Sequence, residues 1–292
     1  MARQIPALVI FEDASWRRLY PLSLTRPIFE MRVGVTTLGR RLIAQMGALK
    51  HDRVALVCRD LLRPTVERAF PGLPVNEIAA GNDVLFLNGA ALFFKGELDR
   101  LLKQLADSPV LESGGRIVAA QLPERDARRL LAWLGEALAG DGSPPPWPKG
   151  LAPKPVREAV RLIERPWDLV HHNEATLNDD FALTRRGREP ALPATAPGAH
   201  LVRKARILSR KGARVDSGAV LDASGGPIIL GEGVRVMPNA VILGPAYIGT
   251  QSVIKVGAKI YGGTSIGAWC KVGGEVEGSI LHGYGNKQHD GF

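Results

Sequence analysis

Apolar residues in the C-terminal third of the chain recur every six positions. The large aliphatic members of this series are Leu230, Val236, Ile242, Ile248, Ile254, Ile260, Ile266 and Val272. Four residues after each of them comes a small or β-branched side chain, from Val234 to Val276. A helix needs an apolar period near 3.6 and a half-buried strand a period of 2, so neither explains a period of six. The spacing predicts a hexapeptide β-solenoid with three hexads in each coil.

In such a solenoid each hexad forms one side of a triangular coil, and its large aliphatic residue points inwards. Successive coils stack at the strand spacing of ~4.8 Å, so the backbone hydrogen bonds and the aliphatic stack continue along the axis. Weaker turns between Ile207 and Val220 are expected to begin the solenoid, and its pattern breaks at Gly283.

Short apolar runs alternate with helical patterns in the N-terminal half. Strands are predicted at 7–11, 53–58, 84–87 and 116–120, and helices at 33–46, 95–106 and 124–138. This alternation indicates an α/β sheet, in which ligands bind at the carboxyl ends of the strands. The segment that follows the first strand, Glu12 to Pro27, is therefore a candidate site.

Proline and polar residues mark the domain organisation. The proline-rich run from Gly140 to Lys154 breaks the helix before it and reads as an excursion inside the first domain. The polar segment from Arg185 to Pro197 is a suitable boundary. We expect one domain over residues 1–190 and a second over residues 191–292.

Composition narrows the function classes. The 292 residues carry 38 lysines and arginines against 29 acidic residues, a formal charge of +9, which favours a phosphate-bearing ligand or an acidic surface. Nucleic-acid binding lacks a recognised motif or interleaved aromatic residues. No secretory signal, membrane-spanning run or metal-type cysteine spacing is present. We expect a cytoplasmic protein without nucleic-acid partner or membrane insertion.

Four arginines lie in or just after the candidate loop, which has no Gly-x-Gly cradle and no P-loop. They precede a predicted helix whose N-terminus is placed near Gly34. Arginines and a helix N-terminus can hold and polarise a triphosphate. The expected assignment is phosphate binding by Arg17, Arg18 and Arg32, with Arg26 as the catalytic cation. The alternative is that these are ordinary surface arginines.

Residues PLSLTRP followed by MRVG resemble the sugar-nucleotidyltransferase domain of a divergent family branch. The segment LNGAAL resembles the strand end where related transferases place a magnesium-binding aspartate, and here that position is Asn88. The resemblance implies Mg²⁺, bound by Asp13 or another carboxylate. The glycine-rich loop of the well-known uridylyltransferases is missing. RPWDLVHHNEATLNDDF resembles the closing segment of the family, whose last helix starts at Trp167.

The hexads resemble those of left-handed β-helix acyltransferases. The stretch from Gly226 to Phe292 is similar to the second half of bacterial bifunctional N-acetylglucosamine-1-phosphate uridylyltransferase/glucosamine-1-phosphate acetyltransferases. The resemblance implies an α/β, Rossmann-like nucleotidyltransferase domain followed by a left-handed parallel β-helix. The handedness comes from the family and not from the spacing.

An acyltransferase of this family needs a base near the amine and cations for the sugar phosphate. The resemblance implies His289, in NKQHDGF, as the base, with acetyl-CoA as co-substrate. It implies sugar-phosphate contacts from Lys255, Glu275, Glu277, Tyr284, Asn286 and Lys287. Each of these could instead be a solvated surface residue. The family continues with coils that bind coenzyme A, so we expect a chain truncated at Phe292 or one without that activity.

The leading hypothesis is a sugar-nucleotide biosynthesis enzyme for cell-envelope precursors. Nucleotidyl transfer would run from a nucleoside triphosphate, by resemblance UTP, to a sugar 1-phosphate such as N-acetylglucosamine 1-phosphate. A homotrimer is implied, because the acyl site in the family is shared between neighbouring solenoids. The alternative is a non-catalytic or regulatory nucleotide-sugar-binding protein whose β-helix is a trimerisation scaffold. The missing glycine loop and Asn88 favour this alternative.

Overall fold

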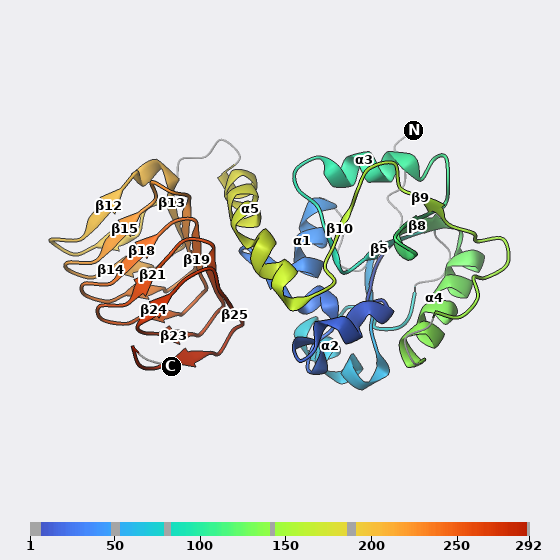
Figure 1. Cartoon of the computed structure of the whole chain (residues 1–292), viewed down its shortest axis with the longest axis horizontal. Helices are drawn as coiled ribbons and strands as arrows, with labels where there is room; N and C mark the ends of the chain where they lie inside the picture. Colours follow the sequence, from blue (N-terminus) through green and yellow to red (C-terminus); the bar gives the residue numbers. More distant parts are fainter. Residues whose placement is uncertain (1–6, 48–52, 79–82, 141–143, 186–190, 291–292) are drawn as a thin grey trace. The chain divides into compact units, whose positions relative to one another are not determined.

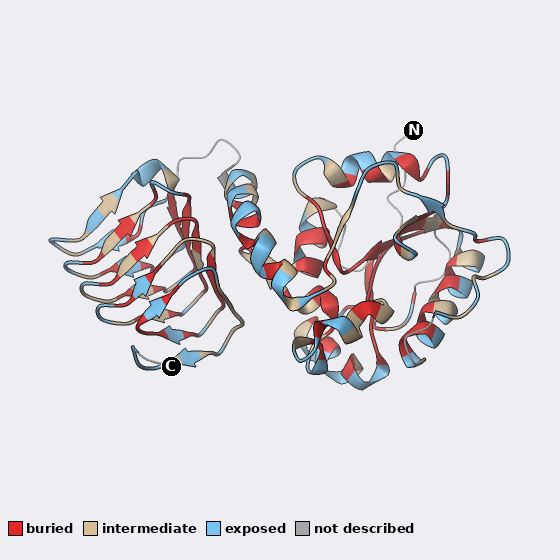
Figure 2. Ribbon diagram, in the orientation of Figure 1, coloured by how far each residue is buried: buried red, intermediate tan, exposed pale blue. Residues whose placement is uncertain are grey.

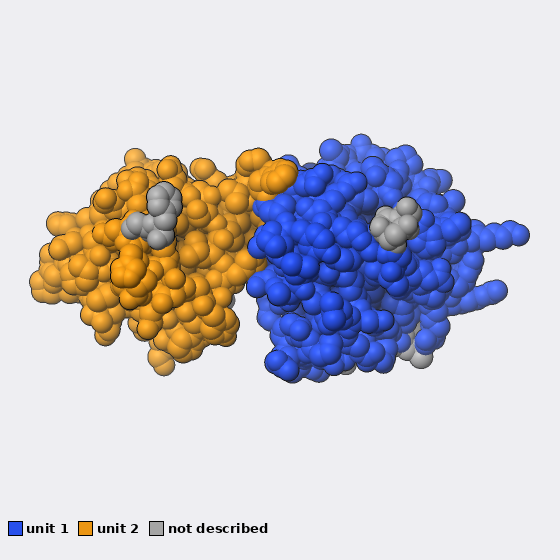
Figure 3. Space-filling view, turned by 60° about the horizontal axis from the view of Figure 1, so that its bottom comes forward, with its two compact units in different colours: residues 1–31, 37–166 blue, residues 32–36, 167–292 orange. Residues whose placement is uncertain are grey.

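The chain forms two compact units. The structure, a computed structural model, describes residues 7–47, 53–78, 83–140, 144–185 and 191–290. Unit 1 comprises Met1–Met31 and Thr37–Pro166, and unit 2 comprises Arg32–Thr36 and Trp167–Phe292 (Figure 3). The expected boundary at residues 190 and 191 adjoins residues 186–190, which lie outside the described ranges. Residues 167–185 group with the C-terminal strands.

Unit 1 is built on a mixed six-stranded sheet with the order β4-β1-β5-β8-β7-β9 (Figure 1). The strands are β4 (Val54–Val57), β1 (Ala7–Phe11), β5 (Val84–Asn88), β8 (Arg116–Leu122), β7 (Val110–Ser113) and β9 (Lys154–Pro155). β1 pairs in parallel with β4 and β5, whereas β8 runs antiparallel to β5 and β7. The α/β prediction is confirmed, with a mixed sheet.

Helices cover both faces of this sheet. They are α1 (Leu38–Gln45), α2 (Arg63–Ala69), α3 (Glu97–Gln104) and α4 (Glu124–Ala139). Leu8 and Ile10 of β1 pack into a core with residues of α1, α2 and α3, while Val9 and Phe11 pack into a second core with α4. β1 is buried on both faces (Figure 2), and this explains its continuous apolar sequence.

The proline-rich excursion packs on α4. Trp147 stacks on Trp133, with ring centroids 4.5 Å apart, and the Trp133 indole N–H donates to the Pro145 carbonyl. Both aromatic residues belong to unit 1. A short antiparallel pair, β6 (Ala91–Leu92) with β10 (Arg161–Leu162), lies later in the same unit.

The prediction of a helix over residues 33–46 is wrong at its N-terminal end. Residues 32–37 form two short strands, β2 (Arg32–Val33) and β3 (Thr36–Thr37), and α1 begins only at Leu38. Gly34 lies in the turn between them with φ of +63°, a conformation that favours glycine. The N-terminus of α1 therefore lies at Leu38 and not at Gly34.

Unit 2 contains three sheets of parallel strands that the chain visits in rotation. The first sheet holds β11 (Ala194–Thr195), β14 (Arg214–Val215), β17 (Arg235–Val236), β20 (Val253–Ile254), β23 (Lys271–Val272) and β26 (Asn286–Lys287). The second holds β12 (His200–Val202), β15 (Val220–Asp222), β18 (Val241–Leu243), β21 (Lys259–Ile260) and β24 (Glu275–Val276). The third holds β13 (Ile207–Ser209), β16 (Ile228–Leu230), β19 (Ala246–Ile248), β22 (Thr264–Ile266) and β25 (Ile280–Leu281). This arrangement is consistent with a three-sided β-helix.

The register of the sheets confirms three hexads per coil over the regular part. Ile248 pairs with Ile266 and Ile254 pairs with Val272, each eighteen residues further on. All eight predicted inward aliphatic residues are buried, none more than 1% exposed. They form a continuous stack, as an aliphatic interior requires.

The period fails outside residues 230–272. Leu221 pairs with Ile242, so the earlier coil is longer, whereas Ile260 pairs with Val276, so the later coil is shorter. Val276, predicted at a small-residue position, thus stacks on a large inward residue. Parallel pairing begins at β11, before Ile207, and continues past Gly283 to β26. Loops between the sides absorb the changes in length, because only the inward residues must stay aligned.

Asn173 connects helix α5 (Pro166–Arg185) to the coils of unit 2. Its buried Oδ1 accepts hydrogen bonds from the Gly34 amide at 2.7 Å and the Ser265 hydroxyl at 3.0 Å, and its Nδ2 donates to the Gly263 carbonyl at 2.7 Å. A Cβ at Gly34 would lie 2.3 Å from Asp180 Oδ2, so only glycine fits there. Among the described residues no helix is long and apolar enough to cross a membrane.

The aliphatic stack predicts the effect of a core truncation. Ile242→Ala is expected to lower the free energy of unfolding of unit 2 by about 2–5 kcal/mol, because the cavity lies between coils that cannot collapse onto it. The control is Val241→Ala, at the neighbouring half-exposed position, with a much smaller loss. Urea unfolding of the full chain, followed by circular dichroism, measures both. Equal losses would contradict the inward stack.

Candidate functional site

Two cavities lie beside the segment that follows β1 and beside helix α4, and no described residue lines both. The chain leaves β1 through Asp13, which caps the 3-10 helix η1 (Ala14–Leu19) by accepting the Ser15 amide at 3.0 Å. A cavity of about 210 Å³ is lined by Asp13, Ser15 and Arg18, and one of about 620 Å³ by Trp16 and Arg17. Different residues of α4 line the two cavities. The larger volume lies in the range of small-molecule sites, roughly 300–1,000 Å³.

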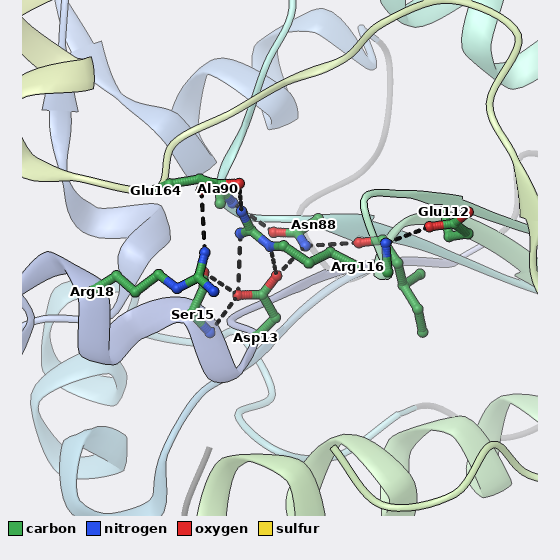
Figure 4. Close-up of polar contacts among 10 residues, drawn as sticks. Asp13, Ser15, Arg18, Asn88, Ala90, Glu112, Arg116 and Glu164 are labelled. Carbon is green, nitrogen blue, oxygen red and sulfur yellow. Dashed lines mark hydrogen bonds and ion pairs between the residues drawn. The ribbon is translucent and has the colours of Figure 1, made fainter. Parts of the chain in front are cut away.

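An aspartate–arginine clamp lies in the smaller cavity (Figure 4). Arg116 donates from Nε to Asp13 Oδ2 at 2.8 Å and from Nη2 to Asp13 Oδ1 at 3.2 Å, and both side chains are only 13% exposed. Asn88 donates from Nδ2 to Asp13 Oδ2 at 2.7 Å. Both oxygens of Asp13 therefore already accept hydrogen bonds from side chains of the protein.

Arg116 keeps Asp13 ionised. Burial by itself raises the pKa of Asp13, but the charge of Arg116 and the hydrogen bonds from Arg116, Ser15 and Asn88 outweigh it. The pKa of Asp13 accordingly lies below its usual value, and the carboxylate is negative at neutral pH.

The predicted magnesium ligand does not fit this arrangement. Mg²⁺ prefers oxygen ligands in octahedral geometry, whereas the oxygens of Asp13 face N–H donors. The strand-end residue Asn88 directs its amide N–H₂, not an oxygen, towards Asp13. No group of three histidine, cysteine or acidic side chains that could hold a metal occurs within the described ranges.

A second ion pair borders the same cavity. Arg18 Nη1 lies 3.2 Å from Glu164 Oε2, and Arg116 Nη1 lies 3.7 Å from Glu164 Oε1. Arg18 and Glu164 are about half exposed. The Glu164 carboxylate thus lies between two guanidinium groups, one held rigidly by Asp13 and one at the surface.

The larger cavity has an apolar wall, and two of its lining residues carry buried donors without a hydrogen-bond partner. Leu131 and Leu138 of α4 form part of the wall, and the guanidinium groups of Arg17 and Arg59 lie 4.4 Å and 3.8 Å from the Trp16 ring. Trp16 Nε1 and Arg17 Nη1 are buried atoms that make no hydrogen bond. Buried donors of this kind suit a ligand with acceptor atoms.

A buried ion pair shapes the loop between these cavities. Glu12 is fully buried and accepts from Arg59 Nε at 2.9 Å, and the Ile28 amide donates to it at 3.1 Å. Arg59 Nη2 also donates to the carbonyls of Ser23 at 2.6 Å and Arg26 at 3.3 Å. Burial raises the pKa of Glu12, and Arg59 offsets part of that rise.

Cys58, beside this pair, lines the larger cavity as a neutral thiol. Burial, with a smaller contribution from the charge of Glu12, raises its pKa to about 12. At neutral pH the sulfur is protonated and so a poor nucleophile.

The structure separates the four predicted arginines. Arg18 borders the smaller cavity and Arg17 the larger one, where its Nη2 donates to the Gly140 carbonyl. Arg26 is half-buried, with its backbone fixed by Arg59, and lines neither cavity. Arg32 belongs to unit 2, donates to the Val35 carbonyl and lies 5.7 Å from the Tyr247 ring.

Arg116 and Glu164 lie outside the predicted segment, and Trp16 lies inside it but was not among the predicted site residues. The sequence signal for Arg116 is weak: it follows Gly114 and Gly115 at the start of a strand. That position faces Asp13 only because β8 lies next to β5 in the sheet.

The C-terminal candidates are only partly brought together. Lys255 Nζ donates to the Gln288 carbonyl at 2.9 Å, and Lys287 Nζ donates to the His289 carbonyl at 3.1 Å. Lys255, Lys287 and His289 are therefore neighbours. Glu275 lies 3.6 Å from Lys259 instead. Three further candidates are exposed: Glu277, Tyr284 and Asn286.

Unit 1 is an α/β domain whose cavities lie at the carboxyl ends of parallel strands, the usual position of ligands in this class. A family model described as sugar nucleotidyl transferase matches residues 8–189, more than half of the chain. The chain therefore belongs to the sugar nucleotidyl transferase family. A comparison with curated proteins finds no match. Family membership confirms that the N-terminal half resembles a sugar nucleotidyltransferase.

The buried ion pair predicts non-additive stability effects. Arg59→Ala is expected to lower the free energy of unfolding by about 3–5 kcal/mol, because it leaves the Glu12 carboxylate buried without a counter-charge. The double variant Glu12→Gln/Arg59→Met removes both charges and is expected to cost less than Arg59→Ala alone. Urea unfolding of the full chain tests this together with the single variants Glu12→Gln and Arg59→Met. A double variant that loses the sum of these two single losses would refute the coupling.

Proposed function

We propose that unit 1 transfers a nucleotidyl group from UTP to a sugar 1-phosphate such as N-acetylglucosamine 1-phosphate, releasing pyrophosphate. The supporting observation is the pair of cavities that lie beside η1 and α4. A nucleoside triphosphate needs adjoining subsites for its nucleoside and its phosphate chain, and the sugar 1-phosphate must then reach the α-phosphorus. Membership of the sugar nucleotidyl transferase family supports the reaction type.

The nucleoside is assigned to the larger cavity. Two of its lining residues, Trp16 and Arg17, carry buried donors without a partner that would suit the carbonyl oxygens of a pyrimidine once their side chains turn towards it. Leu131 and Leu138 suit an apolar ring face. The phosphate chain is assigned to the smaller cavity, which Arg18 and Arg116 border.

The reaction needs one bond to form and one to break. A phosphate oxygen of the sugar 1-phosphate attacks the α-phosphorus of the nucleotide, and the bond from that phosphorus to the pyrophosphate oxygen breaks. The arginines stabilise negative charge on the transferred group. Arg26 remains our candidate catalytic cation: it lines neither cavity, so in this role its side chain would reach the phosphates from the loop after β1. Mg²⁺ would enter with the triphosphate, as part of the substrate.

For unit 2 we propose a left-handed β-helix of acetyltransferase type that acts on an amino-sugar phosphate with acetyl-CoA in a cytoplasmic homotrimer. The neighbouring Lys255, Lys287 and His289 support this assignment. His289 would accept the proton of the amine, and the lysines would hold the phosphate. Contacts with the sugar itself would come from Glu275, Glu277, Tyr284 and Asn286.

A non-catalytic, regulatory nucleotide-sugar-binding protein is the second candidate. It is favoured by Asn88 at the strand end and by the engagement of Asp13 with Arg116. In this role the β-helix would act as a trimerisation scaffold. Binding of UDP-sugar without turnover would identify it.

Pyrophosphate release tests the proposed function. The full chain is assayed with Mg²⁺ and each combination of UTP or dTTP with N-acetylglucosamine 1-phosphate or glucose 1-phosphate. Release is expected only when both substrates are present. Arg26→Ala is expected to lower it by roughly 10²–10³-fold, the scale of losing one charge-stabilising group. Arg68→Ala, at an exposed position of α2, is the control and should retain full activity. Nucleotide binding without release from any pair would refute the enzyme assignment.

A further inference from the structure

The position of Glu164 resembles that of an anion bound between two arginines. One carboxylate oxygen lies 3.2 Å from Arg18 Nη1, and the other lies 3.7 Å from Arg116 Nη1. Figure 4 shows Glu164 in contact with both arginine side chains, and all three residues line the smaller cavity. A phosphate group has the charge and the spread of oxygens to occupy the same place.

Arg116 is oriented towards this place by its other contacts. Nε and Nη2 of Arg116 donate to Asp13, which also accepts hydrogen bonds from Ser15 and Asn88. Nη1 is a buried atom that makes no hydrogen bond, since Glu164 is beyond hydrogen-bond distance. The guanidinium thus presents one unused donor in a fixed direction.

Glu164 can be displaced at low cost. Its side chain is 46% exposed, and Arg18 is 54% exposed, so their ion pair is screened by water. Gly114 and Gly115, which line the same cavity, carry no side chain, and a Cβ added to either would meet nothing within 4 Å. A ligand can therefore reach the arginines when Glu164 turns outwards.

We propose that a phosphate group of the substrate replaces the Glu164 carboxylate between Arg18 and Arg116. In this arrangement the clamped Arg116 supplies the positive charge that an ion bound by Asp13 would supply. The identity of the phosphate carrier rests on the proposed function, but the anion site does not. Glu164 is then a competing internal anion, and Asp13 is a positioning residue for Arg116.

The opposite interpretation makes Asp13 and Glu164 ligands of a metal ion in the same cavity. The two interpretations predict opposite effects of removing the Glu164 charge. A metal ligand that is neutralised weakens the binding of a phosphate through that metal. A competing anion that is neutralised tightens phosphate binding.

Calorimetric titration of the full chain with inorganic pyrophosphate separates them. With EDTA present, the unaltered chain is expected to bind pyrophosphate. Glu164→Gln is expected to bind it roughly two- to fivefold tighter, the scale of one half-exposed ion pair. Arg116→Gln is expected to bind it about tenfold more weakly or worse, as for the loss of a charged hydrogen bond. Loss of binding in EDTA, or weaker binding by Glu164→Gln, would overturn the proposal.

Matched variants control for charge and for folding. Glu158→Gln removes the charge of another half-exposed glutamate, paired with Arg100 at 3.1 Å outside this cavity, and should leave affinity unchanged. Arg116→Lys keeps the charge but loses the two-pronged contact with Asp13, and it should bind more weakly than the unaltered chain. The double variant Arg116→Gln/Asp13→Asn controls for folding, because it leaves no buried charge unpaired. It is expected to fold and to bind pyrophosphate weakly. Unchanged binding by this variant would count against the proposal.

The same titrations distinguish this inference from the proposed function. One outcome is that the variants change pyrophosphate affinity as expected while the activity assay shows no pyrophosphate release. That result supports the anion site and rejects the proposed enzyme activity. Release in the assay, with binding unaffected by Arg116→Gln, supports the enzyme and rejects the anion site.

Discussion

The buried ion pair between Glu12 and Arg59 is the interaction on which the candidate site depends. Glu12 directly follows β1, and Arg59 lies just after the neighbouring strand β4, so the pair is set by the parallel pairing of these two strands. Its remaining hydrogen bonds reach the carbonyls of Ser23 and Arg26 and the amide of Ile28. The loop after β1 contains only short 3-10 helices. These contacts hold it in one conformation, because leaving the buried groups unpaired would be costly.

The same loop gives the site its electrostatic character. Asp13 comes one residue after Glu12, but its charge is used to hold Arg116 and is therefore not available as an open ligand. The cations that remain for a ligand belong to guanidinium groups. This distribution agrees with the absence, in the part of the chain that the structure describes, of a cluster of metal-binding side chains. The use of Asp13 to hold Arg116, in place of Mg²⁺, is the main departure from what the family resemblance implies.

Unit 2 follows a different principle. Its strands are only two or three residues long, so its stability comes from the stacking of inward aliphatic residues and from the parallel backbone ladders between coils. Inward residues must stay aligned, whereas the corners can gain or lose residues. This is why the pairing of Ile260 with Val276 tolerates a shorter coil without exposing the core.

The sequence by itself determined the elements whose pattern is local and repeated. β1, β4, β5, β8 and α4 lie where apolar runs and helical periodicity predicted them, and the inward residues of the solenoid follow from a period of six. The start of α1 was predicted wrongly because Gly34 serves a turn rather than a helix. Only the tertiary structure decided which charges meet. Asp13 follows β1, Asn88 ends β5 and Arg116 begins β8, three strands that are far apart in the chain and adjacent in the sheet. No local pattern encodes this adjacency, nor the approach of Glu164 to Arg116.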